Sequence, residues 1–156
     1  MRVLIVEDEE DKKKEVIAFL QAELIAVDVD NARSLSSGLS ALASRGYDLI
    51  VLDMTMPSFD ISPNEDGGRP QAFGGLELLA HMRRRRSFTP VIVLTQFDRF
   101  GDGQDALTLE ELDARLARDY PANYLGAVHY DVVSEDWKPK LTTMLSKAHF
   151  GEEPNA

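Results

Sequence analysis

Three acidic residues stand directly after hydrophobic runs that have the composition of buried strands. Glu7 and Asp8 follow the run Val3–Val6, and Asp53 follows Leu49–Leu52. In a parallel α/β sheet, the groups that do chemistry lie beyond the carboxyl ends of the strands, so two neighbouring strands ending in acids would bring three carboxylates together. Carboxylates at close range repel one another unless a cation lies between them, and Mg²⁺ prefers such oxygen ligands. The sequence therefore predicts a Mg²⁺ site suited to phosphoryl chemistry.

Strand-like and helix-like segments alternate five times along the chain. Strands are predicted near Arg2–Val6, Val27–Val29, Leu49–Asp53, Val91–Leu94 and Gly126–Tyr130. Apolar residues at helical spacing form stripes between and after them, at Val16, Phe19, Leu20 and Leu24; at Leu35, Leu39 and Leu42; at Leu76, Leu79 and Met82; at Leu109, Leu112 and Leu116; and at Leu141, Leu145 and Ala148. This order predicts right-handed βαβ units, and hence a parallel sheet with helices on both faces.

Size and composition limit the classes of function. A chain of 156 residues is most simply one domain, and we expect it to occupy residues 1–150, with 151–156 as a disordered tail. No apolar run approaches the roughly 20 residues that a membrane helix needs, the N-terminus lacks the pattern of a secretory signal, and cysteine is absent, so we expect a cytoplasmic protein. A net charge of −10 disfavours binding to nucleic acid or to anionic lipid.

Two segments interrupt the alternation of strands and helices. Residues 58–74 are rich in glycine and proline, and residues 96–106 contain Gly101 and Gly103, so both are predicted to be long loops. Because both segments follow the carboxyl ends of strands, we expect them to rim the acidic site and to form a surface for a partner.

Four motifs, in order, resemble the receiver domain of two-component response regulators. They are Val-Leu-Ile-Val-Glu-Asp-Glu at 3–9, Ile-Val-Leu-Asp-Met-Thr-Met-Pro at 50–57, Gly-Leu-Glu-Leu-Leu at 75–79 and Thr-Pro-Val-Ile-Val-Leu-Thr at 89–95. The resemblance implies a (βα)5 flavodoxin-like doubly wound sandwich, in which five parallel strands are ordered 2-1-3-4-5. Its partners would be a histidine kinase or phosphotransfer protein and a downstream protein target, and homodimerisation is left open.

The resemblance also implies roles for individual residues. Asp53 would be the phosphoacceptor, and Mg²⁺ would be held by Glu7, Asp8, Asp53 and the backbone carbonyl of Thr55. Thr95 matches the hydroxyl residue that contacts the phosphoryl group. Tyr130 falls where the family has an aromatic residue that changes position in the switch. Such a domain catalyses at most its own phosphorylation and dephosphorylation and is not otherwise an enzyme.

The sequence departs from the family pattern at one charged position. Receiver domains ordinarily have a lysine, followed by proline, just after the fifth strand, and here Val133 occupies that position. A lysine-proline pair occurs five residues later, so Lys138 is an uncertain candidate for the missing cation. The alternative is that Asp136 caps a helix whose first turn contains Lys138. Lys12 and Arg99 are further candidates, expected in loops near the site.

Three functions therefore compete. The first is a stand-alone receiver that switches docking onto another protein when Asp53 is phosphorylated. The second is a degenerate receiver that binds its partner without phosphorylation, which the valine at the lysine position favours. The third is a Mg²⁺-dependent phosphatase of the haloacid dehalogenase type. That class needs a second aspartate two positions after the nucleophile, where this chain has Thr55, so it is the least supported of the three.

Overall fold

Five parallel strands form the central sheet of the protein. In a computed structural model, which describes residues 1–57, 74–101 and 103–148, the strands are β1 (Arg2–Val6), β2 (Asp28–Ala32), β3 (Leu49–Leu52), β4 (Val91–Thr95) and β7 (Tyr124–His129). Their order in the sheet is β2-β1-β3-β4-β7, and every neighbouring pair is parallel. This is the predicted order, since β7 is the fifth strand of the sheet along the chain. The predicted flavodoxin-like fold is therefore confirmed.

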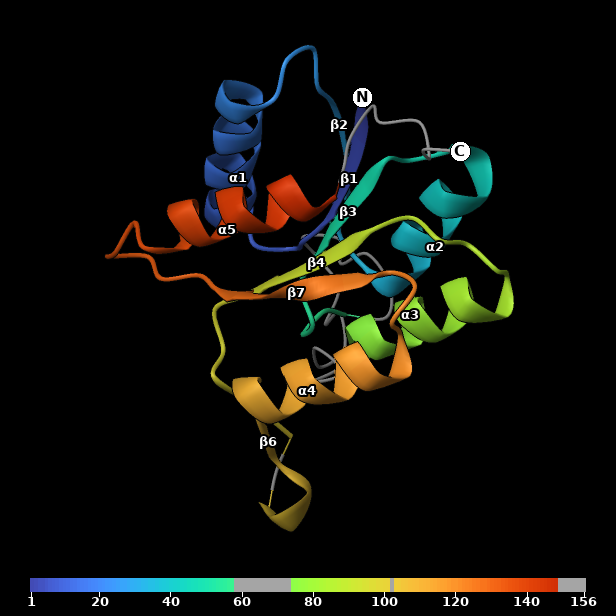
Figure 1. Cartoon of the computed structure of the whole chain (residues 1–156), viewed down its shortest axis with the longest axis vertical. Coiled ribbons are helices and arrows are strands. Elements are labelled where there is room, and N and C mark those ends of the chain that lie inside the picture. The colour runs from blue at the N-terminus through green and yellow to red at the C-terminus, as the bar shows by residue number, and fades with distance from the viewer. Residues whose placement is uncertain (58–73, 102, 149–156) are drawn as a thin grey trace, which may run out of the picture.

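In the part of the chain that the structure describes, five α-helices cover the two faces of this sheet. They are α1 (Glu10–Glu23), α2 (Leu35–Ser44), α3 (Gly74–Arg84), α4 (Leu109–Asp119) and α5 (Trp137–Lys147). Figure 1 shows α1 and α5 on one side of the sheet and α2, α3 and α4 on the other. The chain therefore forms three layers, with the carboxyl ends of all five strands at one edge.

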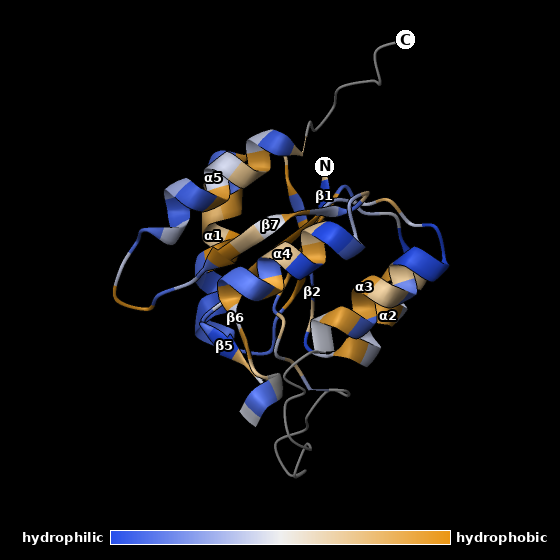
Figure 2. Cartoon of the chain, turned by 60° about the horizontal axis from the view of Figure 1, so that its bottom comes forward, coloured by the Kyte–Doolittle hydropathy of each residue, from blue (hydrophilic) through white to orange (hydrophobic). Residues whose placement is uncertain are grey.

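Strand residues alternate between two hydrophobic cores. Leu4 and Val6 of β1 belong to the core beneath α2, α3 and α4, whereas Val3 and Ile5 belong to the core beneath α1 and α5. The inner strands β1, β3 and β4 are apolar at nearly every position because both faces of a doubly covered parallel sheet are buried, whereas β2 at the edge of the sheet is mostly polar. Figure 2 shows these orange strands enclosed by helices whose hydrophilic faces are turned outward.

Local signals fix where two of the helices begin. Ser34 caps α2, and its side chain accepts a hydrogen bond from the backbone N–H of Ser37 at 3.1 Å. At the start of α3, the backbone N–H of Gly75 donates to the carbonyl oxygen of Met54 at 3.0 Å. A Cβ at this glycine would lie 3.1 Å from the Cα of Met54, so only glycine lets α3 approach the segment after β3 this closely.

The segment 96–106, predicted to be a long loop, contains most of a small hairpin. Strands β5 (Arg99–Phe100) and β6 (Leu107–Thr108) pair antiparallel, and a short 3-10 helix (Gly103–Asp105) lies between them. Phe100 is buried in the core beneath α4, which ties the segment to the domain. The predicted loop at 58–74 lies outside the described residues except for Gly74, which begins α3. The predicted tail at 151–156 also lies outside them.

The structure bears on membrane association in one respect. Among the described residues, no helix combines the length and the apolar composition needed to cross a bilayer.

Candidate functional site

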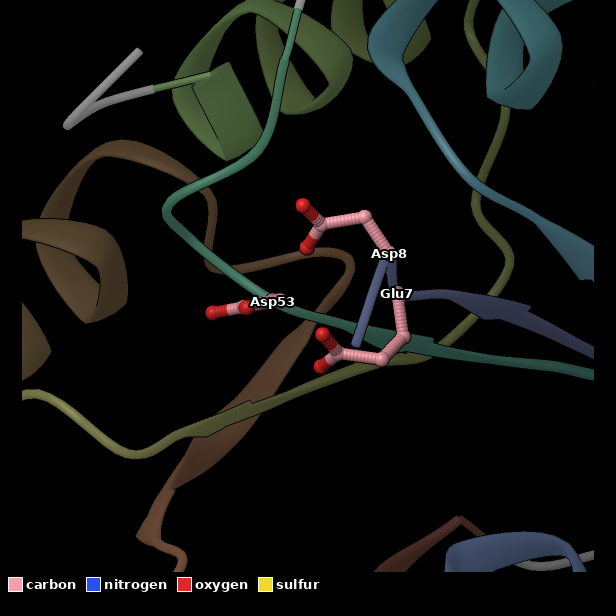
Figure 3. A group of neighbouring side chains, drawn as sticks. All are labelled: Glu7, Asp8 and Asp53. Atoms are coloured by element: carbon pink, nitrogen blue, oxygen red, sulfur yellow. The ribbon is translucent and has the colours of Figure 1, made fainter. Parts of the chain in front are cut away.

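The three predicted acids meet at the carboxyl ends of β1 and β3. These strands are neighbours with Val6 opposite Leu52, and the backbone N–H of Asp53 donates to the carbonyl oxygen of Val6 at 3.0 Å. Carboxylate oxygens of Glu7, Asp8 and Asp53 all lie within 4.8 Å of one another. Figure 3 shows Glu7 and Asp8 turned to opposite sides of the end of β1, with Asp53 beside them.

Two of these carboxylates are almost completely removed from solvent. Glu7 is 4% exposed and Asp53 is 5% exposed, whereas Asp8 is partly exposed. Burial raises the pKa of Glu7 to about 7, although the nearby ammonium of Lys12 acts to lower it. Burial likewise raises the pKa of Asp53, and Lys12 again acts in the opposite direction. The site therefore favours a compensating positive charge.

Lys12 places an ammonium group among these acids. Its Nζ lies 2.5 Å from Oε2 of Glu7 and 3.6 Å from Oδ2 of Asp53, and it donates a 2.7 Å hydrogen bond to the carbonyl oxygen of Leu94. The side chain is only 2% exposed. Among the ion pairs of the described residues, those of Lys12 are the ones that reach this cluster, at Glu7 and Asp53.

Lys12 was expected in a loop, but it belongs to the first turns of α1. Residues Lys12, Val16 and Leu20 are the buried residues of that helix, at intervals of four. Residues four apart lie on the same helical face, so Lys12 extends the apolar stripe directly toward the carboxyl ends of the strands. Its spacing before Val16 was the signal in the sequence that could have singled it out.

The other candidate cations have different surroundings. Val133, at the usual lysine position, is 93% exposed in the connection between β7 and α5. Lys138 lies in the first turn of α5, which Asp136 precedes as N-cap, and its Nζ lies 2.9 Å from Oε1 of Glu135. Arg99 is exposed on β5. The structure thus gives Lys138 a surface partner and brings Lys12 to Asp53.

A hydrogen bond between backbone groups connects Thr95 and Tyr130. Thr95 ends β4 and is fully buried, and its Oγ1 accepts a hydrogen bond from the N–H of Phe97 at 3.2 Å. The N–H of Tyr130 donates to the carbonyl oxygen of Thr95 at 2.7 Å. The phenol of Tyr130 donates to Oε2 of Glu15 at 2.6 Å, and its ring is buried against Trp137, with centroids 5.2 Å apart.

The acids fit the expected metal ion by their chemistry. All three offer carboxylate oxygens, the hard ligands that Mg²⁺ prefers, and two of them are buried where a bound cation would offset the unfavourable burial of negative charge. The remaining predicted ligand is the backbone carbonyl of Thr55, whose N–H donates to Oδ1 of Asp53 at 3.3 Å. The residues present therefore suit Mg²⁺.

Comparisons of sequence with known proteins point to one family. The family model described as the response regulator receiver domain matches residues 3–116. The protein y4jR of Sinorhizobium fredii is 34% identical over 144 residues, which cover 90% of this chain and 94% of that protein. The Detocs response regulatory protein DtcB of Enterobacter cloacae is 30% identical over 149 residues, which cover 94% of this chain and 99% of that protein.

Solved structures share the fold at lower sequence identity. The chemotaxis response regulator CheY4 of Vibrio cholerae matches with a TM-score of 0.61 and 17% identity, over 94% of this chain and 97% of that one. The regulator TrrA of Thermotoga maritima, solved in complex with Mg²⁺ and BeF, matches with a TM-score of 0.57 and 21% identity, over 92% of this chain and 97% of that one.

Proposed function

Because the chain belongs to the response regulator receiver domain family, we propose that Asp53 accepts a phosphoryl group from a histidine kinase or a phosphotransfer protein. The observation that carries this proposal is the convergence of Glu7, Asp8 and Asp53 at one edge of the sheet. Receiver domains signal by phosphorylation, and this cluster supplies both an acceptor carboxylate and acids that suit a metal ion.

The transfer requires one bond to form and one to break. A carboxylate oxygen of Asp53 attacks the phosphorus atom of a phosphohistidine, so that a P–O bond forms while the P–N bond breaks. The imidazole nitrogen keeps the electron pair of the broken bond and takes up a proton from water. The product on Asp53 is an acyl phosphate, which water can later hydrolyse, so the chemistry ends with the protein's own phosphorylation and dephosphorylation.

The residues that would hold Mg²⁺ are Glu7, Asp8, Asp53 and the carbonyl of Thr55. When bound, the ion would offset the negative charge that accumulates as the phosphoryl group meets the carboxylate. The buried positions of Glu7 and Asp53 limit access of water to the acceptor, and the hydrogen bond from the Thr55 N–H orients one Asp53 oxygen.

The output of this domain would be a change in docking onto a downstream protein. Thr95 would contact the phosphoryl oxygens. Tyr130 would then change position, because its backbone N–H is hydrogen-bonded to the carbonyl oxygen of Thr95. A stand-alone receiver without an output domain is supported by the relatives y4jR and DtcB, which the match covers over 94% and 99% of their own lengths.

A phosphorylation assay tests the proposal directly. The protein is incubated with Mg²⁺ and a small phosphoryl donor, and intact mass is measured. We expect the mass of one added phosphoryl group on the wild-type protein and none on Asp53→Asn. The matched control is Asp98→Asn, an exposed acid that follows the neighbouring strand β4, and it should be labelled like the wild type. Labelling of Asp53→Asn to the wild-type extent would contradict the proposal.

A phosphorylation-independent binding domain is the alternative. It is favoured by the exposed Val133, which leaves the usual lysine position without a charge. In that case the wild-type protein would show no mass increase with any donor, whereas its partner would bind Asp53→Asn as tightly as wild type.

A further inference from the structure

The cation that the family places after the last strand has a counterpart at the start of α1. We propose that Lys12 performs this role here by contacting the phosphoryl group on Asp53. This inference deepens the proposed function and rests on it. Nothing in the similarity to receiver domains assigns such a contact to a residue of the first helix.

The geometry supports a direct contact with the reacting carboxylate. An ammonium group has three N–H donors. In Lys12, short contacts at 2.5 Å and 2.7 Å engage Glu7 and the carbonyl of Leu94, while Oδ2 of Asp53 is 3.6 Å away. A separation of 3.6 Å is longer than a hydrogen bond but close enough for strong attraction in a buried site. Lys12 therefore has capacity left for an oxygen added at Asp53.

The position of Lys12 also connects the acceptor to the switch residues. Leu94 directly precedes Thr95 at the end of β4, so the carbonyl that Lys12 holds belongs to the residue next to the switch hydroxyl. The ring of Tyr130 lies 5.7 Å from the Nζ of Lys12. A shift of the ammonium toward a phosphoryl oxygen would thus release or weaken contacts at the element that carries the switch.

The burial of Lys12 indicates that its positive charge has a role in the site. A lysine is rarely fully buried unless it is paired, because removing an ammonium group from water is unfavourable. An apolar residue at position 12 would continue the stripe of Val16 and Leu20 but would leave the buried carboxylates of Glu7 and Asp53 without their counter-charge. The site instead has an ammonium that touches one predicted metal ligand and faces the predicted acceptor.

This role predicts opposite effects on two ligands. In the absence of phosphate, Lys12 is a cation bound to acids that Mg²⁺ also needs, so Lys12→Met should bind Mg²⁺ as tightly as wild type or more tightly. For a phosphoryl group, Lys12 is an attractive contact, so the same variant should bind a phosphate mimic more weakly. A variant that simply disturbs the fold would weaken both, so the split separates contact from structure.

The experiment measures both affinities by NMR titration of the full chain. Wild type, Lys12→Met and the control Lys14→Met, an exposed lysine on the same helix, are titrated first with Mg²⁺ alone and then with beryllofluoride at saturating Mg²⁺. We expect Lys12→Met to keep or improve its Mg²⁺ affinity and to lose beryllofluoride affinity by roughly 10-fold, the effect of one charge-assisted contact. The control should match wild type in both titrations.

Two outcomes would overturn the inference. One is unchanged beryllofluoride affinity in Lys12→Met, and the other is a parallel weakening for both ligands. If wild type binds beryllofluoride and Asp53→Asn does not, the proposed function stands whatever Lys12 does. If wild type fails to bind it, the proposed function fails instead.

A measurement on the wild type avoids dependence on the folding of the variant. The Cε resonance of Lys12 should shift when beryllofluoride binds to the Mg²⁺-loaded protein, whereas that of Lys138, paired with Glu135 on the surface, should not. Absence of a shift at Lys12 would contradict the contact.

Discussion

The start of α1 and the connection between β7 and α5 differ in whether they carry a positive charge. At the start of α1, a lysine is 2% exposed and bonded to a site acid. In the connection, where the family places its lysine, Val133 is 93% exposed. The comparison shows that a positive charge can lie beside the site acids even when the residue that carries it belongs to a different element of the fold. A flexible four-carbon stem lets an ammonium reach the same acids from a different helix.

Removing the charge at α1 should have the largest effect on stability. Lys12→Met leaves Glu7 and Asp53 buried without their counter-charge, and we expect a loss of about 2 kcal/mol in the free energy of unfolding, below the usual 3–5 because the carboxyls can take up protons. Urea unfolding in Mg²⁺-free buffer measures it. A variant as stable as wild type would show that the pair contributes nothing.

Adding Mg²⁺ should reduce the difference in stability between wild type and Lys12→Met. A ligand that binds only the folded state stabilises it, and the variant offers its acids without a competing ammonium. We therefore expect a larger increase in melting temperature with Mg²⁺ for Lys12→Met than for wild type, reversed by a chelator. An equal increase in both proteins would mean that Lys12 and the metal do not compete.

A smaller effect is expected at the aromatic residue between the two regions. Tyr130→Phe removes the hydrogen bond to Glu15 on α1 but keeps the ring against Trp137. The expected loss is about 1 kcal/mol, the typical net contribution of a hydrogen bond. Urea unfolding measures it, and Glu15→Gln, which keeps an acceptor, serves as control and should lose less.

The smallest effects on stability are expected in the connection between β7 and α5 and in the first turn of α5. Val133→Ser and Lys138→Ala alter an exposed side chain and a surface ion pair, so each should change stability by less than about 0.5 kcal/mol. Both should bind beryllofluoride like wild type. A large loss of beryllofluoride binding in Lys138→Ala would mean that Lys138 on α5 supplies the cation, and the difference between the two regions would not hold.

The sequence could predict the sheet and its acids because these follow from short, regular patterns. Apolar runs identified the inner strands β1, β3 and β4, and the acids Glu7, Asp8 and Asp53 follow from where two of those runs end. The polar edge strand β2, predicted at Val27–Val29 and found at Asp28–Ala32, has only a weak pattern. The hairpin at β5 and β6 escaped prediction because strands of two residues carry too little periodicity, and a single buried residue, Phe100, anchors them. The place of Lys12 in the buried face of α1 could not be predicted in the same way, because a charged side chain interrupts an apolar stripe and its burial depends on tertiary partners.

The lysine on α1 also changes what sequence divergence among relatives should look like. A chain that carries its cation at position 12 no longer needs one after the last strand, so that connection is free to vary in length and composition. The family match to this chain ends at residue 116, before β7 and α5. Across an alignment of relatives, lysine at these two places should therefore be exclusive: chains that have it four residues before the first apolar position of α1 should lack it after the fifth strand.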